Sequence, residues 1–200
     1  MAELTWRAQS IGTVADFLTA AECDGYIRLS ESTGFEEAPV TTGSGMVIMK
    51  EVRNNDRAMI DDAARAGDLY RRLSGLLPPR FNDKWEPIGL NERLRLYRYD
   101  VGQQFDWRLD GSYERDNGER SYFTFMVYLN DDFQGGATSF RDGHGTPVGG
   151  LLHVTPKKGM ALLFYHPIPH RGDPVTAGRK YVLRTDVMYA YRRGEGQISP

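Results

Sequence analysis

The stretch Glu92–Gly111, ERLRLYRYDVGQQFDWRLDG, sets the character of the second half of the chain. Apolar or aromatic residues alternate with charged ones in its first half, which is the pattern of a strand. Over its last residues, FDWRLDG, the same alternation places the side chains of Arg108 and Asp110 on one face of the chain. The stretch therefore predicts β structure that carries a guanidinium and a carboxylate to the same side.

Further segments of the same kind follow as far as residue 191. They are short, rich in aromatic and β-branched residues, and separated by turn signals such as DG, GG, DGHG and PKKG. These segments are SYFTFMVYLN, LLHVTP, GMALLFY and KYVLRTDVMYAY. Many short strands with frequent turns are typical of a sandwich or barrel, so we expect a mainly β protein with a jelly-roll core.

Two helices are predicted before this region. Thr19 and Glu22 form a capping-box pattern and Gly34 is a stop signal, which predicts a helix over about 20–33. The segment that begins at Asp56, DRAMIDDAARAGDLYRRLSGLL, has near-helical spacing and is followed by two prolines, which predicts a second helix over about 57–77. Gly67 weakens its middle. We expect one domain over 1–200, with helical support over about 1–91 and the core over about 92–191.

Composition excludes several classes of protein. The 200 residues are 40% apolar and 26% charged with a net charge of −2, which predicts a globular domain and gives no electrostatic reason to expect nucleic acid. The longest apolar stretches, such as GMALLF, are too short to span a bilayer, and the N-terminus lacks an apolar secretory core. The single cysteine, Cys23, allows no internal disulfide and suits the cytoplasm; we interpret it as a small apolar residue on a helix.

Four histidines are the candidates for metal chemistry. His144 lies in the loop DGHGTP and is expected to be solvated, and His153 is expected on a strand surface. His166 and His170 lie in FYHPIPHRG, directly after an apolar strand, where the chain leaves the core. A histidine at such a rim is a candidate ligand, although by itself it decides little.

Order and spacing together are more specific. Asp110, the turn GGATSF (Gly135–Phe140), His170 and a basic residue ten positions later, Lys180, form one series. This series resembles the prolyl 4-hydroxylase-like branch of the iron(II)- and 2-oxoglutarate-dependent dioxygenases. The likeness covers roughly Arg93 to Tyr189 and is weaker in the helices and in VRNN (52–55). It implies an eight-stranded double-stranded β-helix from about Glu92 to Tyr191.

The resemblance also implies a site. In the family a motif Y-x-x-G-Q ends in H-x-D, and here it reads YDVGQQFDWRLD. The metal-binding aspartate then falls on Asp110 and the distal histidine on His170, while the first histidine falls on Arg108. The implied cofactors are Fe(II) with 2-oxoglutarate and dioxygen as cosubstrates, because two imidazoles and one carboxylate leave three open positions on iron.

The same resemblance places a cation and two polar residues around 2-oxoglutarate. Lys180 fits the cation that holds the far carboxylate, with Tyr99 and Thr138 beside the cosubstrate. Arg184 is the alternative cation, because it shares a strand face with Lys180.

Arg108 cannot take the place of a ligand histidine, since a guanidinium has no lone pair to donate near neutral pH. Three interpretations remain. The protein has lost or altered its iron chemistry, it carries a deliberate substitution in a working enzyme, or another group such as Asp106 or His166 completes the coordination.

Two functions therefore remain open. The first is an oxygenase that hydroxylates a small molecule or a protein side chain, with activity impaired by Arg108. The second is a non-catalytic module that binds a carboxylate ligand, in which Arg108 pairs with Asp110 or with that ligand. Substrate choice is expected to depend on the loops GSYERDNGER and TTGSGMVIMK. Either an entrance to the site or ordinary surface is the expected place of Trp85, Tyr113 and Arg115.

Overall fold

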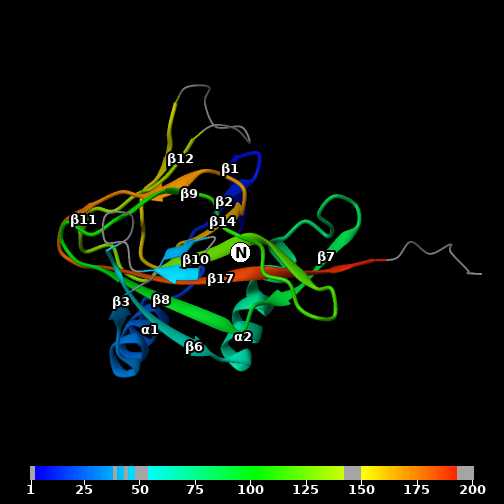
Figure 1. Ribbon diagram of the computed structural model, residues 1–200, viewed down its shortest axis with the longest axis horizontal. Helices are drawn as coiled ribbons and strands as arrows, with labels where there is room; N and C mark the ends of the chain where they lie inside the picture. Colours follow the sequence, from blue (N-terminus) through cyan, green and yellow to red (C-terminus); the bar gives the residue numbers. More distant parts are fainter. Residues whose placement is uncertain (1–2, 38–39, 43–44, 48–53, 142–149, 193–200) are drawn as a thin grey trace, which may run out of the picture.

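Two facing antiparallel sheets form the centre of the molecule (Figure 1). The structure, a computed structural model, describes residues 3–37, 40–42, 45–47, 54–141 and 150–192. In the larger sheet the central order is β14 (Ala161–Tyr165), β10 (Arg120–Tyr128), β17 (Lys180–Tyr191) and β8 (Arg93–Tyr99). The smaller sheet has the order β13 (Leu152–Val154), β12 (Thr138–Phe140), β15 (His170–Gly172) and β9 (Phe105–Arg108). These eight strands form a jelly roll, which confirms the predicted fold class.

Strands from the first ninety residues extend the larger sheet at both edges. On the β14 side these strands are β2 (Ile11–Val14) and β1 (Leu4–Ala8); on the β8 side they are β6 (Asp56–Asp61) and β3 (Glu36–Glu37). A further strand, β7 (Trp85–Leu90), pairs with the second half of β17. Two short pairs stand apart: β11 (Gln134–Gly135) with β16 (Val175–Ala177), and β4 (Val40–Thr42) with β5 (Gly45–Val47). The part of the chain predicted as helical support thus contributes sheet as well.

The first helix, α1 (Ala20–Thr33), has the predicted bounds. The Thr19 hydroxyl accepts a hydrogen bond from the backbone of Glu22, whose carboxylate in turn accepts one from the backbone of Thr19. The helix ends at Gly34, where φ is 84°. Cys23 is fully buried on α1, as expected for a small apolar residue.

The second helix is shorter than predicted. Residues 56–61 are the strand β6, and α2 runs only over Ala63–Leu73, followed by the 3-10 turn η1 (Ser74–Leu76). The prediction of helix from residue 57 was wrong because β8 offers an open edge with which these residues pair. Side chains of opposite charge join the two strands, with the carboxylate of Asp61 on β6 2.8 Å from the guanidinium of Arg93 on β8. The helix begins after Asp62, whose side chain accepts a hydrogen bond from the backbone of Arg65.

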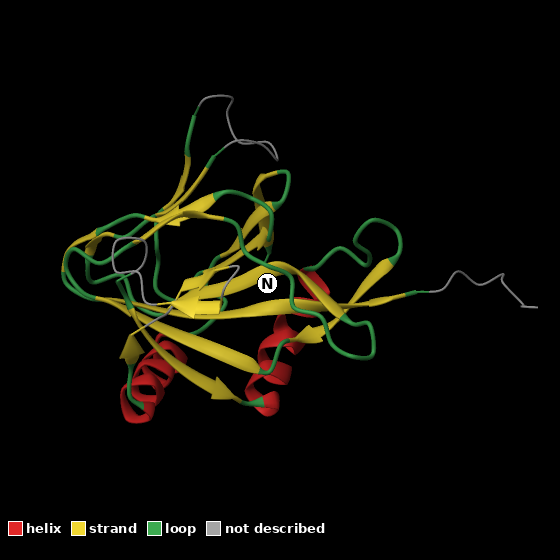
Figure 2. Ribbon diagram, in the orientation of Figure 1, coloured by secondary structure: helices red, strands yellow, loops and turns green. Residues whose placement is uncertain are grey.

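Both helices cover the face of the larger sheet that points away from the smaller sheet (Figure 2). One apolar cluster, which includes Leu73, Leu96 and Leu183, lies between the helices and this sheet. A second cluster, which includes Phe140 and Val182, lies between the two sheets. Consecutive residues of β17 therefore point to opposite sides, and its even-numbered residues from 180 to 184 enter the jelly roll.

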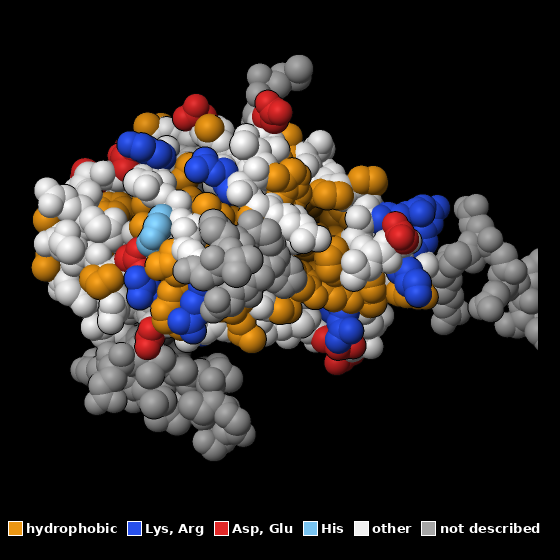
Figure 3. Space-filling view, turned by 90° about the horizontal axis from the view of Figure 1, so that it is seen from above, with side chains coloured by type: hydrophobic (Ala, Val, Ile, Leu, Met, Phe, Trp, Pro, Cys, Tyr) orange, Lys and Arg blue, Asp and Glu red, His pale blue; other side chains and the backbone are white. Residues whose placement is uncertain are grey.

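On the face shown in Figure 3, acidic and basic side chains lie side by side, and neither sign of charge gathers in one region. Apolar side chains form a continuous area over the middle and right of this view. Among the described residues, no helix is long and apolar enough to cross a membrane.

Candidate functional site

A pocket lies between the two sheets of the jelly roll. Five lining residues come from β8 and β17: Tyr97, Tyr99, Lys180, Val182 and Arg184. The other described lining residues are Phe105, Arg108, Asp110, Thr124, Met126, Phe164 and His170. Five of the six residues predicted for the site therefore line one pocket, together with Arg108.

Strand pairing brings Arg108 and His170 face to face. In the ladder between β9 and β15 these two residues are direct partners, and Asp110 follows β9 by two residues. His170 is 2% exposed, and its Nδ1–H donates to the carbonyl of Ile168 at 2.9 Å. The lone pair is then on Nε2, which lies 3.6 Å from Oδ2 of Asp110. Burial lowers the pKa of His170, so the ring is held in its neutral form.

Asp110 is a buried carboxylate with close polar partners. Its Oδ2 lies 3.0 Å from Nη2 of Arg184 and accepts a hydrogen bond from the Thr124 hydroxyl at 2.6 Å. Burial alone would raise the pKa of Asp110, but the charge of Arg184, with smaller effects from His170 and Arg108, holds it well below its usual range. Asp110 is therefore ionised.

Arg108 enters the same pocket from the smaller sheet. Its guanidinium carbon lies 4.1 Å from the centre of the Phe105 ring, a cation–π contact that orients the group. The alternation in FDWRLDG predicted that Arg108 and Asp110 share a face, and both line the pocket.

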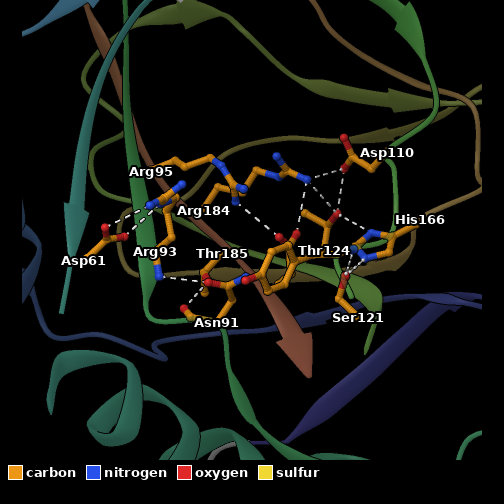
Figure 4. A network of polar contacts seen from close by, with 12 residues as sticks. Asp61, Asn91, Arg93, Arg95, Asp110, Ser121, Thr124, His166, Arg184 and Thr185 are labelled. Atoms are coloured by element: carbon orange, nitrogen blue, oxygen red, sulfur yellow. Dashed lines mark hydrogen bonds and ion pairs between the residues drawn. The ribbon is translucent and has the colours of Figure 1, made fainter. Parts of the chain in front are cut away.

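His166 lies behind the pocket wall. Its Nδ1 is 3.0 Å from the Thr124 hydroxyl and its Nε2 is 2.9 Å from the Ser121 hydroxyl, so both ring nitrogens are engaged (Figure 4). The backbone carbonyl of His166 accepts a hydrogen bond from the backbone of Asp110. These contacts position Thr124 and Asp110, and they rule out the interpretation of His166 as a ligand from the pocket side.

Asp106 does not reach the pocket either. It is exposed, and its carboxylate accepts a hydrogen bond from the backbone of Trp107 at 2.7 Å. The interpretation in which Asp106 completes a metal site was wrong, because Asp106 is exposed and is not part of the described pocket lining.

Lys180 lies at another part of the pocket wall. It is 3% exposed, and its Nζ donates to the carbonyl of Gly136 at 2.5 Å, close to the rings of Tyr99 and Tyr128. Burial lowers its pKa to about 7. Gly136 has φ of 63°, and a Cβ there would lie 3.1 Å from Cδ of Lys180. The GGATSF turn thus needs glycine to make room for the lysine.

Thr138, on β12 of the smaller sheet, does not line the described pocket. Its hydroxyl is 2.7 Å from the hydroxyl of Tyr128. Tyr97 and Phe164 were not predicted to line the site, because aromatic residues are common in any strand. Tyr97 could have been predicted from Tyr99, since residues two apart in a strand lie on the same face.

The predicted entrance residues lie elsewhere. Trp85 packs against Tyr122 and Tyr191, and Arg115 pairs with Glu119 at 2.6 Å. Tyr113, like these two, is not part of the described pocket lining, although it is 44% exposed.

The remaining histidines are not pocket residues in the described chain. His153 is on β13, as predicted for a strand surface, with Nδ1 2.7 Å from the Ser139 hydroxyl. His144 and half of the predicted loop at 41–50 lie outside the described residues.

Comparisons with known proteins identify the family. The profile of the 2OG-Fe(II) oxygenase superfamily matches residues 94–185. Probable prolyl 4-hydroxylase 9 of Arabidopsis thaliana is 33% identical over an alignment of 205 positions. The alignment covers 90% of this chain and 68% of that protein. Probable prolyl 4-hydroxylase 4 of the same plant is 29% identical and covers 82% of this chain. The chain spans 62% of the length of that relative and of prolyl 4-hydroxylase 2.

Solved structures show the same fold. A prolyl-4-hydroxylase from Pseudomonas putida superposes with a TM-score of 0.62 at 18% identity, over 92% of this chain and 94% of that one. A viral collagen prolyl hydroxylase from Paramecium Bursaria Chlorella virus-1, in complex with 2-oxoglutarate, gives 0.61 at 19% identity, over 90% and 96%. The chain belongs to the prolyl 4-hydroxylase-like 2-oxoglutarate and iron(II) oxygenases, which confirms the resemblance. The cofactors of this family are iron(II), 2-oxoglutarate and dioxygen, as predicted.

The residues of this pocket do not fit the family's iron. Asp110 and His170 supply two donors, and the residue opposite His170 is an arginine, which supplies none. Among the described residues, no group of three His, Cys, Asp or Glu side chains lies close enough to hold a metal ion. Two positive guanidinium groups, Arg108 and Arg184, also act on Asp110.

Proposed function

We propose that this chain is an oxygenase-family protein that binds 2-oxoglutarate but whose hydroxylase activity is impaired by Arg108. The observation that carries the proposal is the pairing of Arg108 on β9 with His170 on β15. Arg108 is two residues before Asp110, and all three residues line the same pocket. By the resemblance this is the position of the family's first ligand histidine. A guanidinium there removes one ligand and adds a positive charge beside the remaining two.

Lys180 and its neighbours support retained binding of 2-oxoglutarate. In the proposal the ammonium of Lys180 holds the far carboxylate, with Tyr99 beside it. The burial of Lys180 favours this role, because a buried ammonium gains most from a carboxylate partner. Arg184 is the weaker candidate for the far carboxylate, since its guanidinium is shared by Asp110 and Asp186.

The relatives support a proposal for the substrate class. Several are prolyl 4-hydroxylases, and a prolyl hydroxylase from Trichoplax adhaerens, solved with a peptide of hypoxia inducible factor, shares the fold. We propose that a chain with restored iron binding would act on a peptide or protein side chain, with a small molecule as the alternative.

An iron titration tests the proposal. We expect the unmodified chain to bind iron(II) weakly under anaerobic conditions and to form little succinate from 2-oxoglutarate once oxygen is added. Arg108→His supplies the third donor, so iron should bind at least about tenfold more tightly and succinate formation should begin.

Arg93→His is the matched control, because Arg93 is half exposed and pairs with Asp61 outside the pocket. It should leave iron binding unchanged. The proposal fails if the unmodified chain already binds iron tightly and turns over, with Arg108→His no better.

A non-catalytic binding module is the second candidate. It is favoured by the charge of the pocket, whose described lining includes three cationic side chains and one carboxylate. If Arg108→His binds iron and 2-oxoglutarate yet forms no succinate, this second function is preferred.

A further inference from the structure

We infer that the pocket binds a five-carbon dicarboxylate without any metal, with Lys180 at one carboxylate and Arg108 at the other. The inference deepens the proposed function and rests on it for the role of Lys180. It assigns to Arg108 a ligand of its own, instead of treating that residue only as a lost histidine.

Charge is the first observation. Asp110 contacts Arg184 at 3.0 Å, Arg184 also lies 3.3 Å from Asp186, and Asp186 lies 3.2 Å from Arg95. These four residues form a row in which two positive and two negative groups alternate; Asp110, Arg184 and Arg95 are labelled in Figure 4. Arg108 and protonated Lys180 add two more positive charges to the pocket wall. Buried positive charge is costly, so a ligand with two negative charges would stabilise the pocket.

Placement is the second observation. Lys180 begins β17 of the larger sheet, whereas Arg108 ends β9 of the smaller sheet, and both line the same pocket. The two cations thus approach from opposite walls. Aromatic rings of Tyr99, Phe105 and Phe164 lie in the same lining, and their faces suit the methylene groups of a short dicarboxylate.

The chemistry of Arg108 suits a carboxylate. Its planar guanidinium can donate two parallel hydrogen bonds to the two oxygens of a carboxylate. Stacking on the Phe105 ring holds the plane of the group, which reduces the entropy lost on binding. Asp110 contacts Arg184 and Thr124 and also feels the charge of Arg108, so one carboxylate serves two guanidinium groups. A ligand carboxylate would add a second anion beside Arg108.

A consequence separates this site from a metal-dependent one. A metal that is chelated by 2-oxoglutarate needs the 2-oxo group as well as its neighbouring carboxylate. Arg108 needs the carboxylate alone. Glutarate, which lacks the 2-oxo group, should therefore bind this chain about as well as 2-oxoglutarate does.

Calorimetry in the presence of a strong chelator tests the inference. We expect glutarate and 2-oxoglutarate to bind the unmodified chain with similar affinity, and pentanoate, which has one carboxylate, to bind at least about tenfold more weakly. Arg108→Gln should lower the affinity for glutarate by about tenfold to a hundredfold, since the variant loses a charge-assisted contact. Arg93→Gln, at the surface pair with Asp61, should bind like the unmodified chain.

Arg108→His provides a reciprocal test. It should lose chelator-resistant binding of glutarate and gain binding of 2-oxoglutarate that depends on iron(II). Circular dichroism verifies that each variant is folded, and the comparison of glutarate with pentanoate on the unmodified chain needs no variant at all.

The inference is overturned if neither dicarboxylate binds in chelator, if pentanoate binds as well as glutarate, or if folded Arg108→Gln binds glutarate normally. Succinate formation by the unmodified chain would instead contradict the proposed function, so the two failures have different readouts.

Discussion

Lys180 is the residue whose protonation controls the charge of the pocket. Burial lowers its pKa from 10.5 to about 7, so near neutral pH the amine of the ligand-free protein is only partly protonated. A carboxylate binds the ammonium form. We therefore expect the affinity for glutarate or 2-oxoglutarate to fall as the pH rises above about 7, by up to about tenfold per pH unit.

Calorimetric titrations across this pH range measure the effect. Lys180→Met, of similar length and without charge, should bind the dicarboxylate weakly with little pH dependence. The free energy of unfolding depends on the same titration, with the opposite direction. The unfolded chain holds more protons than the folded one between about pH 7 and 10.5, so the stability of the unmodified chain should rise with pH across that window. A flat affinity profile for the unmodified chain would show that Lys180 does not contact the ligand.

Single residues of the pocket could be predicted where strand geometry or spacing determined them. Alternation along FDWRLDG gave the common face of Arg108 and Asp110, and both line the pocket. Thr138 and Asp106 could not be placed, because the contacts between the two sheets and the irregular pairing of β9 with β15 join residues that are distant in sequence. Thr138 bonds to Tyr128 across the smaller and larger sheets, and Asp106 turns to solvent.

At the scale of elements, the jelly roll and α1 could be predicted, whereas β6 could not. DRAMID has helix-forming residues and stands directly before a true helix, so its local pattern favours helix. The open edge of β8 decides otherwise, since Arg98 and Arg93 of that strand pair with Asp56 and Asp61 of β6. Local propensity is a weak influence that tertiary pairing overrides.

The turn between β13 and β14 depends on one glycine. Gly159 has φ of 81°, and a Cβ there would lie 2.2 Å from the carbonyl oxygen of Leu18. Its own carbonyl accepts a hydrogen bond from the backbone of Leu18, which ties the turn to the segment before α1. We expect Gly159→Ala to lower the free energy of unfolding by at least about 1–3 kcal/mol, because both the backbone strain and the clash must be relieved.

Gly67→Ala is the matched comparison. Gly67 lies within α2, and a Cβ there would meet nothing within 4 Å. The substitution should stabilise the protein by about 0.5–1 kcal/mol through helix propensity. Urea unfolding of the two variants measures both changes, and a stabilising Gly159→Ala would contradict the positive-φ turn.

On the scale of the whole molecule, one sheet joins the early strands to the jelly roll. The pair of β1 and β2 attaches to β14, and β6 attaches to β8, so the N-terminal residues form both edges of the larger sheet (Figure 1). Ile11 of β2 is fully buried in the cluster between the two sheets, beside residues of the jelly roll. The core that supports the pocket is therefore completed by a segment that is far in sequence from the other buried members of this cluster, which run from Tyr97 to Val182.

This arrangement predicts that the chain unfolds as a single domain. Ile11→Ala should lower the free energy of unfolding by about 2–5 kcal/mol, because it leaves a cavity inside the jelly roll. Ile88→Ala on β7, where the side chain is 40% exposed, should change it by no more than about 0.5 kcal/mol. Far-ultraviolet circular dichroism and tryptophan fluorescence should follow one common transition in urea for both variants, since Trp6, Trp85 and Trp107 lie on three different strands. Two separate transitions, with Ile11→Ala shifting only one of them, would mean that the N-terminal strands unfold independently of the pocket.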